Sequence, residues 1–99
     1  MGLYSLLGEE YVEVVDIFEG DWEWQIFTAW FNNKTNKYYW YGESGCSCDN
    51  YGDYVETLSE LEYGDREALL RAVKSWYHNE ITPQYLNTVA KIKNFNPLV

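Results

Sequence analysis

The sequence predicts an α+β domain, with a three-stranded antiparallel meander followed by two C-terminal helices packed on one face of the sheet. Three observations support this prediction. Apolar and aromatic residues alternate with the two-residue period of strands in the first half of the chain, and they recur at helical spacing in the second half. No linker, repeat or low-complexity segment divides the 99 residues. We therefore expect one domain spanning residues 1–99.

Three runs in the first half fit strands. Tyr11–Phe18 is rich in Val and Ile, which favour strands, and the short turn Glu19–Asp21 follows it. The second run, Trp22–Phe31, has two different faces at the strand period. One face carries Trp22, Trp24, Ile26, Thr28 and Trp30, and the other carries Glu23, Gln25, Phe27, Ala29 and Phe31. After a polar loop, Tyr38–Glu43 is the third expected strand, and the buried face sets the register of the meander.

Capping signals open each helix expected in the second half. Thr57 stands three residues before Glu60, the pattern of a capping box at a short helical turn. Asp65 is an N-cap for the next helix, and Thr82 with Pro83 starts the last one. The expected apolar stripes are Leu69, Leu70, Val73, Trp76 and Tyr77 in the first of these helices and Tyr85, Leu86, Val89, Ala90 and Ile92 in the second. Each stripe would pack on the sheet.

Acidic residues are concentrated in the first two thirds of the chain. Residues 1–65 hold fourteen acids and two bases, a net charge of −12, whereas residues 66–99 carry a net charge of +3. Direct binding to nucleic acid would need the opposite sign, because Lys and Arg neutralise phosphates there. We therefore expect no direct nucleic-acid partner. The acidic surface either serves solubility or meets a basic partner protein.

The location expected from the sequence is the cytoplasm. No segment approaches the roughly 20 apolar residues of a membrane span. The first residues, MGLYSLLGEE, carry no basic segment and no long apolar run, so they do not fit a signal peptide. Aromatics make up 19% of the chain, which disfavours disorder. We expect a soluble protein with no membrane partner.

The Gly-Cys-Ser-Cys turn is a candidate metal or redox site. Cys46, Cys48 and His78 are the possible zinc ligands, and the fourth position would fall to an acid such as Asp49. Structural zinc normally takes two Cys or His pairs, so this signal is weak. A disulfide two residues apart is near the limit of its geometry, and a cytosolic protein would keep it reduced. The favoured interpretation is a pair of partly buried, unreactive thiols that end the sheet, with no metal and no cofactor.

The sequence does not predict an enzyme. Nucleophilic catalysis needs a base beside the nucleophile, and His78, the single histidine, is expected only to contact the dipole at a helix C-terminus. The chain has no phosphate loop and no dinucleotide fingerprint. Carboxylate pairs are too abundant for any one of them to indicate acid–base chemistry.

The stretch Tyr38–Tyr54, YYWYGESGCSCDNYGDY, carries a family resemblance. An aromatic strand that runs into SGCSC, then an acidic loop and a TLSEL helix start, resembles small proteins of unknown function encoded by tailed phages of actinobacteria. The resemblance covers roughly residues 20–75. Many of these relatives carry Pro after the second cysteine, where this chain has Asp49. The resemblance implies a phage gene product made in a bacterial cytosol, and it implies no activity.

The leading hypothesis is a small, non-enzymatic binding protein. Both faces of the second and third strands are aromatic and two helices cover only one of them, so we expect exposed Trp or Tyr that can anchor a partner. The partner would be a basic host protein, such as a defence or transcription factor whose nucleic-acid-binding site is blocked. The predicted contact residues are Glu9, Glu10, Glu13, Asp16, Glu19, Asp21, Glu23, Trp22 and Tyr41.

Two alternatives from other classes stay open. One is a metal-stabilised module that uses Cys46, Cys48 and His78. The other is a self-assembling phage component in which the surplus aromatics form a homo-oligomer interface.

Overall fold

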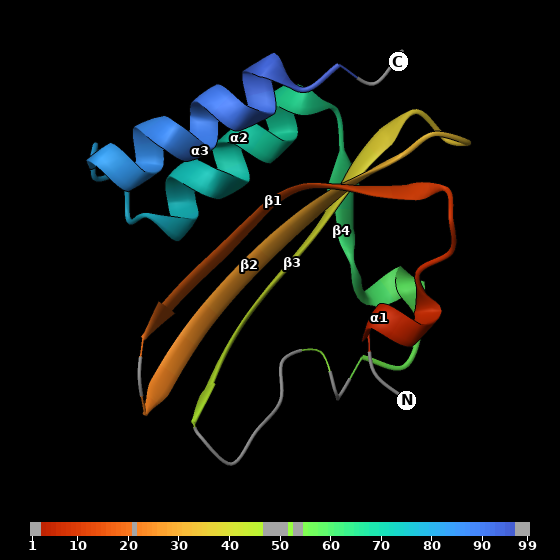
Figure 1. The fold of residues 1–99 in the computed structure, drawn as a ribbon, viewed down its shortest axis with the longest axis horizontal. Helices are drawn as coiled ribbons and strands as arrows, with labels where there is room; N and C mark the ends of the chain where they lie inside the picture. The colour runs from red at the N-terminus through yellow and green to blue at the C-terminus, as the bar shows by residue number, and fades with distance from the viewer. Residues whose placement is uncertain (1–2, 21, 47–51, 53–54, 97–99) are drawn as a thin grey trace.

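A computed structural model describes residues 3–20, 22–46, 52 and 55–96 (Figure 1). In chain order its elements are α1 (Leu3–Leu6), β1 (Tyr11–Gly20), β2 (Glu23–Asn32), β3 (Lys37–Cys46), the 3-10 helix η1 (Leu58–Glu60), β4 (Glu62–Gly64), α2 (Arg66–Trp76) and α3 (Pro83–Asn94). The prediction of an antiparallel sheet followed by two C-terminal helices is confirmed.

The sheet has four strands in the order β1-β2-β3-β4, so the prediction of three was wrong. The strand that the sequence did not reveal, β4, is three residues long, too short to show alternation. It pairs antiparallel with β3 only from Tyr38 to Trp40. The three expected strands are present, and each extends beyond its expected end, β3 as far as Cys46.

Helices α2 and α3 lie together over one face of the sheet (Figure 1). The face beneath them is the one that carries Phe27, Ala29 and Phe31 of β2, not the tryptophan-rich face. The core here consists of Val15, Phe27, Ala29, Phe31, Tyr38 and Trp40 from the sheet with Leu69, Val73 and Ile92 from the helices. We call this side the helix face.

The opposite face of the sheet has a second, smaller core. Trp30 of β2 is buried there under Leu3, Val55 and Leu61, which come from α1 and from the segments beside η1. Tyr39 and Tyr41 of β3 pack against the same cluster. The sequence suggested that only two helices were available as cover, so this second core was missed, and fewer aromatics are exposed than expected.

The predicted helix starts are confirmed. The Asp65 carboxylate accepts the Ala68 N–H at 2.9 Å, and the Thr82 hydroxyl accepts the Tyr85 N–H at 3.1 Å. The predicted inner stripe of α3 is only partly right. Leu86 is 54% exposed, whereas Thr88 is buried and donates its hydroxyl to the Gln84 carbonyl at 2.9 Å. Thr88 reaches the core because this bond satisfies its polar atom.

Candidate protein-binding surfaces

The tip of the β1–β2 hairpin carries the most exposed aromatic of the described residues, Trp22, and a second exposed ring, Phe18, which is as exposed as Tyr63 of β4. Trp22 is 79% exposed and Phe18 is 60% exposed, and Glu19 and Glu23 beside them are also exposed. We call Phe18, Glu19, Trp22 and Glu23 the hairpin surface; it includes both sides of the hairpin tip, because Phe18 points to the face opposite the helices and Glu19 to the helix face. Trp22 was a predicted anchor, and its exposure agrees with that role.

A β-bulge explains why Phe18 faces solvent. The register of β1 against β2 shifts between Glu13 and Val15, so Val14 is an extra residue in β1. After the bulge Val15 points into the core of the helix face, while Phe18 lies opposite Ile26 on the other face. A one-residue shift exchanges the two faces of a strand. The expected strand Tyr11–Phe18 gave no sign of this shift.

Six of the seven acids predicted as partner contacts are described by the structure, and these six do not form one patch. Glu10 forms an ion pair with Lys34, with 3.5 Å between Oε2 and Nζ, and Glu9 precedes it in the same turn. Glu13 and Asp16 lie on the face opposite the helices, and the Asp16 carboxylate accepts the buried Thr28 hydroxyl at 2.9 Å.

Of these seven acids, Glu19 and Glu23 are the two that the described structure places beside Trp22, in the same hairpin. Asp21 lies outside the described residues.

Tyr41, the second predicted anchor, is only half-exposed. It projects from the face opposite the helices, and its hydroxyl donates to Glu43 Oε1 at 2.6 Å. Burial, followed by this hydrogen bond and by the negative charges of Glu43 and Glu60, raises the pKa of Tyr41 to about 12. The phenol therefore remains a neutral hydrogen-bond donor through the physiological pH range.

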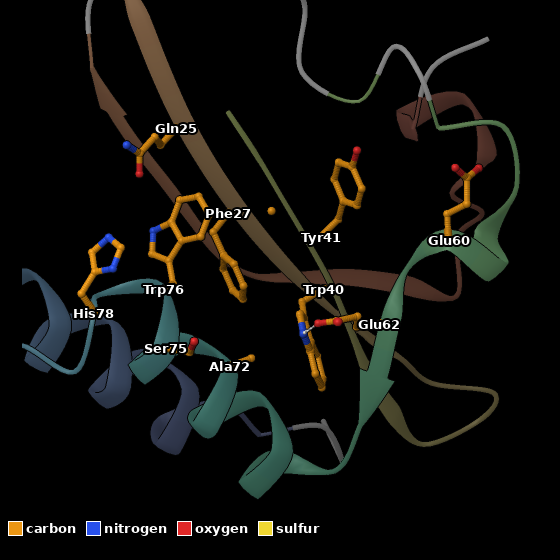
Figure 2. Close-up of a pocket in the computed structure, with 11 residues that line it drawn as sticks. Gln25, Phe27, Trp40, Tyr41, Glu60, Glu62, Ala72, Ser75, Trp76 and His78 are labelled. Atoms are coloured by element: carbon orange, nitrogen blue, oxygen red, sulfur yellow. Dashed lines mark hydrogen bonds between the residues drawn. The ribbon is translucent and has the colours of Figure 1, made fainter. Parts of the chain in front are cut away.

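A groove of about 520 Å³ opens beside Tyr41, where β3 and the η1–β4 segment separate (Figure 2). It is lined on the helix face by Phe27, Trp40, Gly42 and Trp76, and on the other face by Tyr41 and Glu60. Figure 2 shows Trp76 projecting from α2 toward Phe27, and Glu60 on the far side of Tyr41. We call this site the edge groove.

The charge of the edge groove is negative. Glu60 and Glu62 line it, and none of its described lining residues is Lys or Arg. The backbone N–H groups of Thr57 and Glu56 donate to the Glu60 carboxylate at 2.9 and 2.7 Å and hold its pKa below the usual range. The Glu62 carboxylate accepts the buried Trp40 Nε1–H at 2.8 Å. These bonds hold both carboxylates in place.

The edge groove is a site that sequence reasoning missed. Glu60 was recognised as part of a capping box, and Trp76 as part of a helical stripe. The groove exists because β4 stops pairing with β3 at Trp40. To predict the groove, one would need to know where β4 ends, and β4 is too short to be recognised from the sequence.

The predicted pair of free thiols is wrong, because Cys46 is disulfide-bonded. The other cysteine of the sequence, Cys48, lies outside the described residues, as does Asp49. A disulfide sulfur does not offer the thiolate that zinc requires. His78 lies in the turn after α2 with a left-handed backbone (φ 56°), and its side chain lines the edge groove (Figure 2). The described residues include no group of three His, Cys, Asp or Glu able to hold a metal.

The chain belongs to a family described as a domain of unknown function, DUF7574, whose model matches residues 2–95. Neither a curated protein nor a solved structure matches it. Among the described helices, none has both the length and the apolar character needed to cross a membrane.

Proposed function

We propose that this protein is a small, non-enzymatic binding protein whose acidic hairpin surface occupies a basic site on another protein. One observation carries the proposal. Trp22 is 79% exposed, and the exposed acids Glu19 and Glu23 lie in the same hairpin, in a fold that buries the other four of the five tryptophans at least in part. An exposed aromatic beside charges of one sign is the composition of an interface anchor with an electrostatic rim.

The resemblance to phage proteins extends this proposal to the nature of the partner. We propose a host protein with a basic, nucleic-acid-binding site, such as a defence or transcription factor, in which the carboxylates take the place of phosphates. The proposed compartment is the bacterial cytosol. There the Cys46 disulfide would be reduced, and the hairpin surface does not include Cys46.

The test is affinity capture from a bacterial host lysate with three forms of the protein. Glu19→Lys/Glu23→Lys reverses the acids, Trp22→Ala removes the anchor, and Glu67→Lys changes an exposed acid on α2 as the control. A basic protein retained by the wild type and the control at low salt, and lost from both hairpin variants, supports the proposal. Equal recovery by all forms contradicts it.

Self-assembly through the hairpin surface is the competing outcome. Size-exclusion chromatography with light scattering separates the two. A dimer or larger assembly that Trp22→Ala converts to monomer would assign the exposed tryptophan to a homo-oligomer interface instead.

A further inference from the structure

Within the described residues, strand β3 has an open edge along its second half. It is ten residues long, whereas its neighbour β4 has three residues and pairs with β3 only at Tyr38, Tyr39 and Trp40. In the part of the chain that the structure describes, no strand pairs with residues 42–45 on that side. An edge of this kind presents alternate backbone N–H and C=O groups to any extended chain that lies beside it.

The edge groove runs along the start of this open edge and has walls on both sides of the sheet. On the helix face the wall is mainly apolar, formed by Phe27, Trp40 and Trp76, with the Phe27 and Trp76 ring centroids 5.5 Å apart. The Glu62 carboxylate on this side is bonded to the Trp40 Nε1–H. On the other face the wall is polar and acidic, formed by Tyr41 and Glu60, with Glu43 bonded to the Tyr41 hydroxyl.

A strand added at this edge would send alternate side chains to the two walls. Successive side chains of a strand point to opposite faces of a sheet. Every second side chain would therefore meet Trp76 and Phe27, and the side chains between them would meet Glu43 and Glu60. The apolar wall favours aliphatic residues, and the acidic wall favours Lys or Arg, because opposite charges stabilise such pairs.

We propose that the edge groove binds an extended segment of a partner protein in which basic and aliphatic residues alternate, and that this segment adds a fifth strand to the sheet beside β3. The inference rests on the proposed function, since it gives the basic partner a second contact away from the hairpin surface. A second copy of this chain is the less favoured occupant. The chain carries a net charge of −9, so two copies paired through β3 would place acidic side chains against acidic side chains, which repel each other.

The probe that tests this inference is a blocked synthetic decapeptide of alternating Lys and Val. Titration into isotopically labelled protein, followed by NMR, is expected to shift the backbone amide signals of residues 42–45 and to protect them from hydrogen exchange. The same peptide with Glu in place of Lys is expected not to bind. A peptide of five Lys followed by five Val keeps the charge without the alternation, and it is expected to bind at least several-fold more weakly.

Backbone methylation separates strand addition from simple charge attraction. In an extended peptide the N–H groups of the Lys residues point to one edge and those of the Val residues to the other. Methylating one of these two sets should weaken binding about tenfold or more, since each ladder bond contributes a factor of roughly 2–10, while methylating the other set should not. Equal effects of both methylations overturn the inference.

Protein variants locate the contact and keep this inference distinct from the proposed function. Glu43→Gln/Glu60→Gln preserves the size of both side chains and is expected to weaken the peptide several-fold. Glu19→Gln/Glu23→Gln removes the same charge from the hairpin surface and is expected to leave the peptide affinity within twofold. If only the hairpin variant weakens the peptide, the edge groove is not the site, although the proposed function stands. Absence of any binding, or dimerisation of the free protein through β3, also overturns the inference.

Discussion

The indole ring of Trp76 lies directly against the backbone of Gly42, so that α2 contacts β3 where β3 loses its strand partner. A Cβ built at Gly42 would lie 2.9 Å from Trp76 Cζ3 and 3.3 Å from Trp76 Cε3, with Phe27 Cδ2 at 3.4 Å. Glycine at this position therefore permits the close approach that forms one wall of the edge groove.

Gly42→Ala is expected to destabilise the fold by about 1–3 kcal/mol, because the added methyl displaces the Trp76 ring. The sign is informative, since replacing a strand glycine without such a contact usually stabilises a sheet. Urea denaturation measures the change. In a Trp76→Leu background, Gly42→Ala should lower the unfolding free energy by less, and a double-mutant cycle measures this coupling between positions 42 and 76. Identical costs in the two backgrounds would show that the ring does not set the requirement.

The hydrogen bond between Trp40 and Glu62 fixes β4 to β3 beside the edge groove. Trp40 is buried and its Nε1–H has the Glu62 carboxylate as acceptor at 2.8 Å. Glu62→Ala is expected to cost about 1 kcal/mol, at the lower end of the range for an unsatisfied donor because Glu62 is exposed and water can reach the site. Glu62→Gln retains an acceptor oxygen and should cost less. If chemical denaturation shows the same loss of unfolding free energy for Glu62→Ala and Glu62→Gln, this hydrogen bond does not have the assigned role.

Glu60 should make the fold sensitive to acid. Its pKa is held below the usual value by the backbone N–H groups of Thr57 and Glu56. Its contribution is therefore present above the unfolded-state pKa of about 4.5 and is lost as the pH falls through the lower folded-state pKa. Thermal unfolding between about pH 6 and pH 3 should show a smaller loss of Tm for Glu60→Gln than for the wild type.

Glu80→Gln is the matched control for that experiment, since it removes one exposed carboxylate from the connection between α2 and α3. If the Tm of Glu60→Gln and the Tm of Glu80→Gln fall equally as the pH is lowered, the backbone hydrogen bonds to Glu60 do not contribute to the pH dependence of stability.

Tyr41 should titrate late at alkaline pH. Its pKa is raised to about 12, chiefly by burial and next by the hydrogen bond to Glu43. Because the folded-state pKa lies above the usual 10, the stability from Tyr41 is fully present below about pH 10 and is lost as the pH rises toward 12. The difference in ultraviolet absorbance between wild type and Tyr41→Phe isolates its titration from the other nine tyrosines. Glu43→Gln should lower this pKa, and an unchanged midpoint would contradict the contribution of Glu43.

The parts of the fold that the sequence predicted are those with local signals. Asp65 and Thr82 mark helix starts by side-chain chemistry alone, and Leu69 and Val73 repeat at helical spacing. The structure adds features that depend on contacts far apart in the chain. The burial of Trp30 needs Leu3 and Val55, which no local pattern connects to it.

The candidate sites show the same division. An exposed Trp was expected because both faces of the second and third strands are aromatic, but Trp22 was placed within the second strand, whereas it precedes β2 in the structure. The outward direction of Phe18 depends on the bulge at Val14, which the run of valines conceals because either face accepts Val. The edge groove depends on the length of β4, a tertiary property, so the roles of Glu60 and Trp76 there could not be read from their neighbours.

The proposed binding of a basic site by the acids beside Trp22 is tested by the Kd of the captured partner as a function of salt. For the wild type, the Kd should rise steeply between about 50 and 300 mM NaCl, since screening weakens exposed charge pairs. Glu19→Lys/Glu23→Lys should weaken binding at low salt and flatten this dependence, whereas Trp22→Ala should weaken binding and leave the slope unchanged. A Kd that is independent of salt, or unaffected by either hairpin variant, would contradict the account.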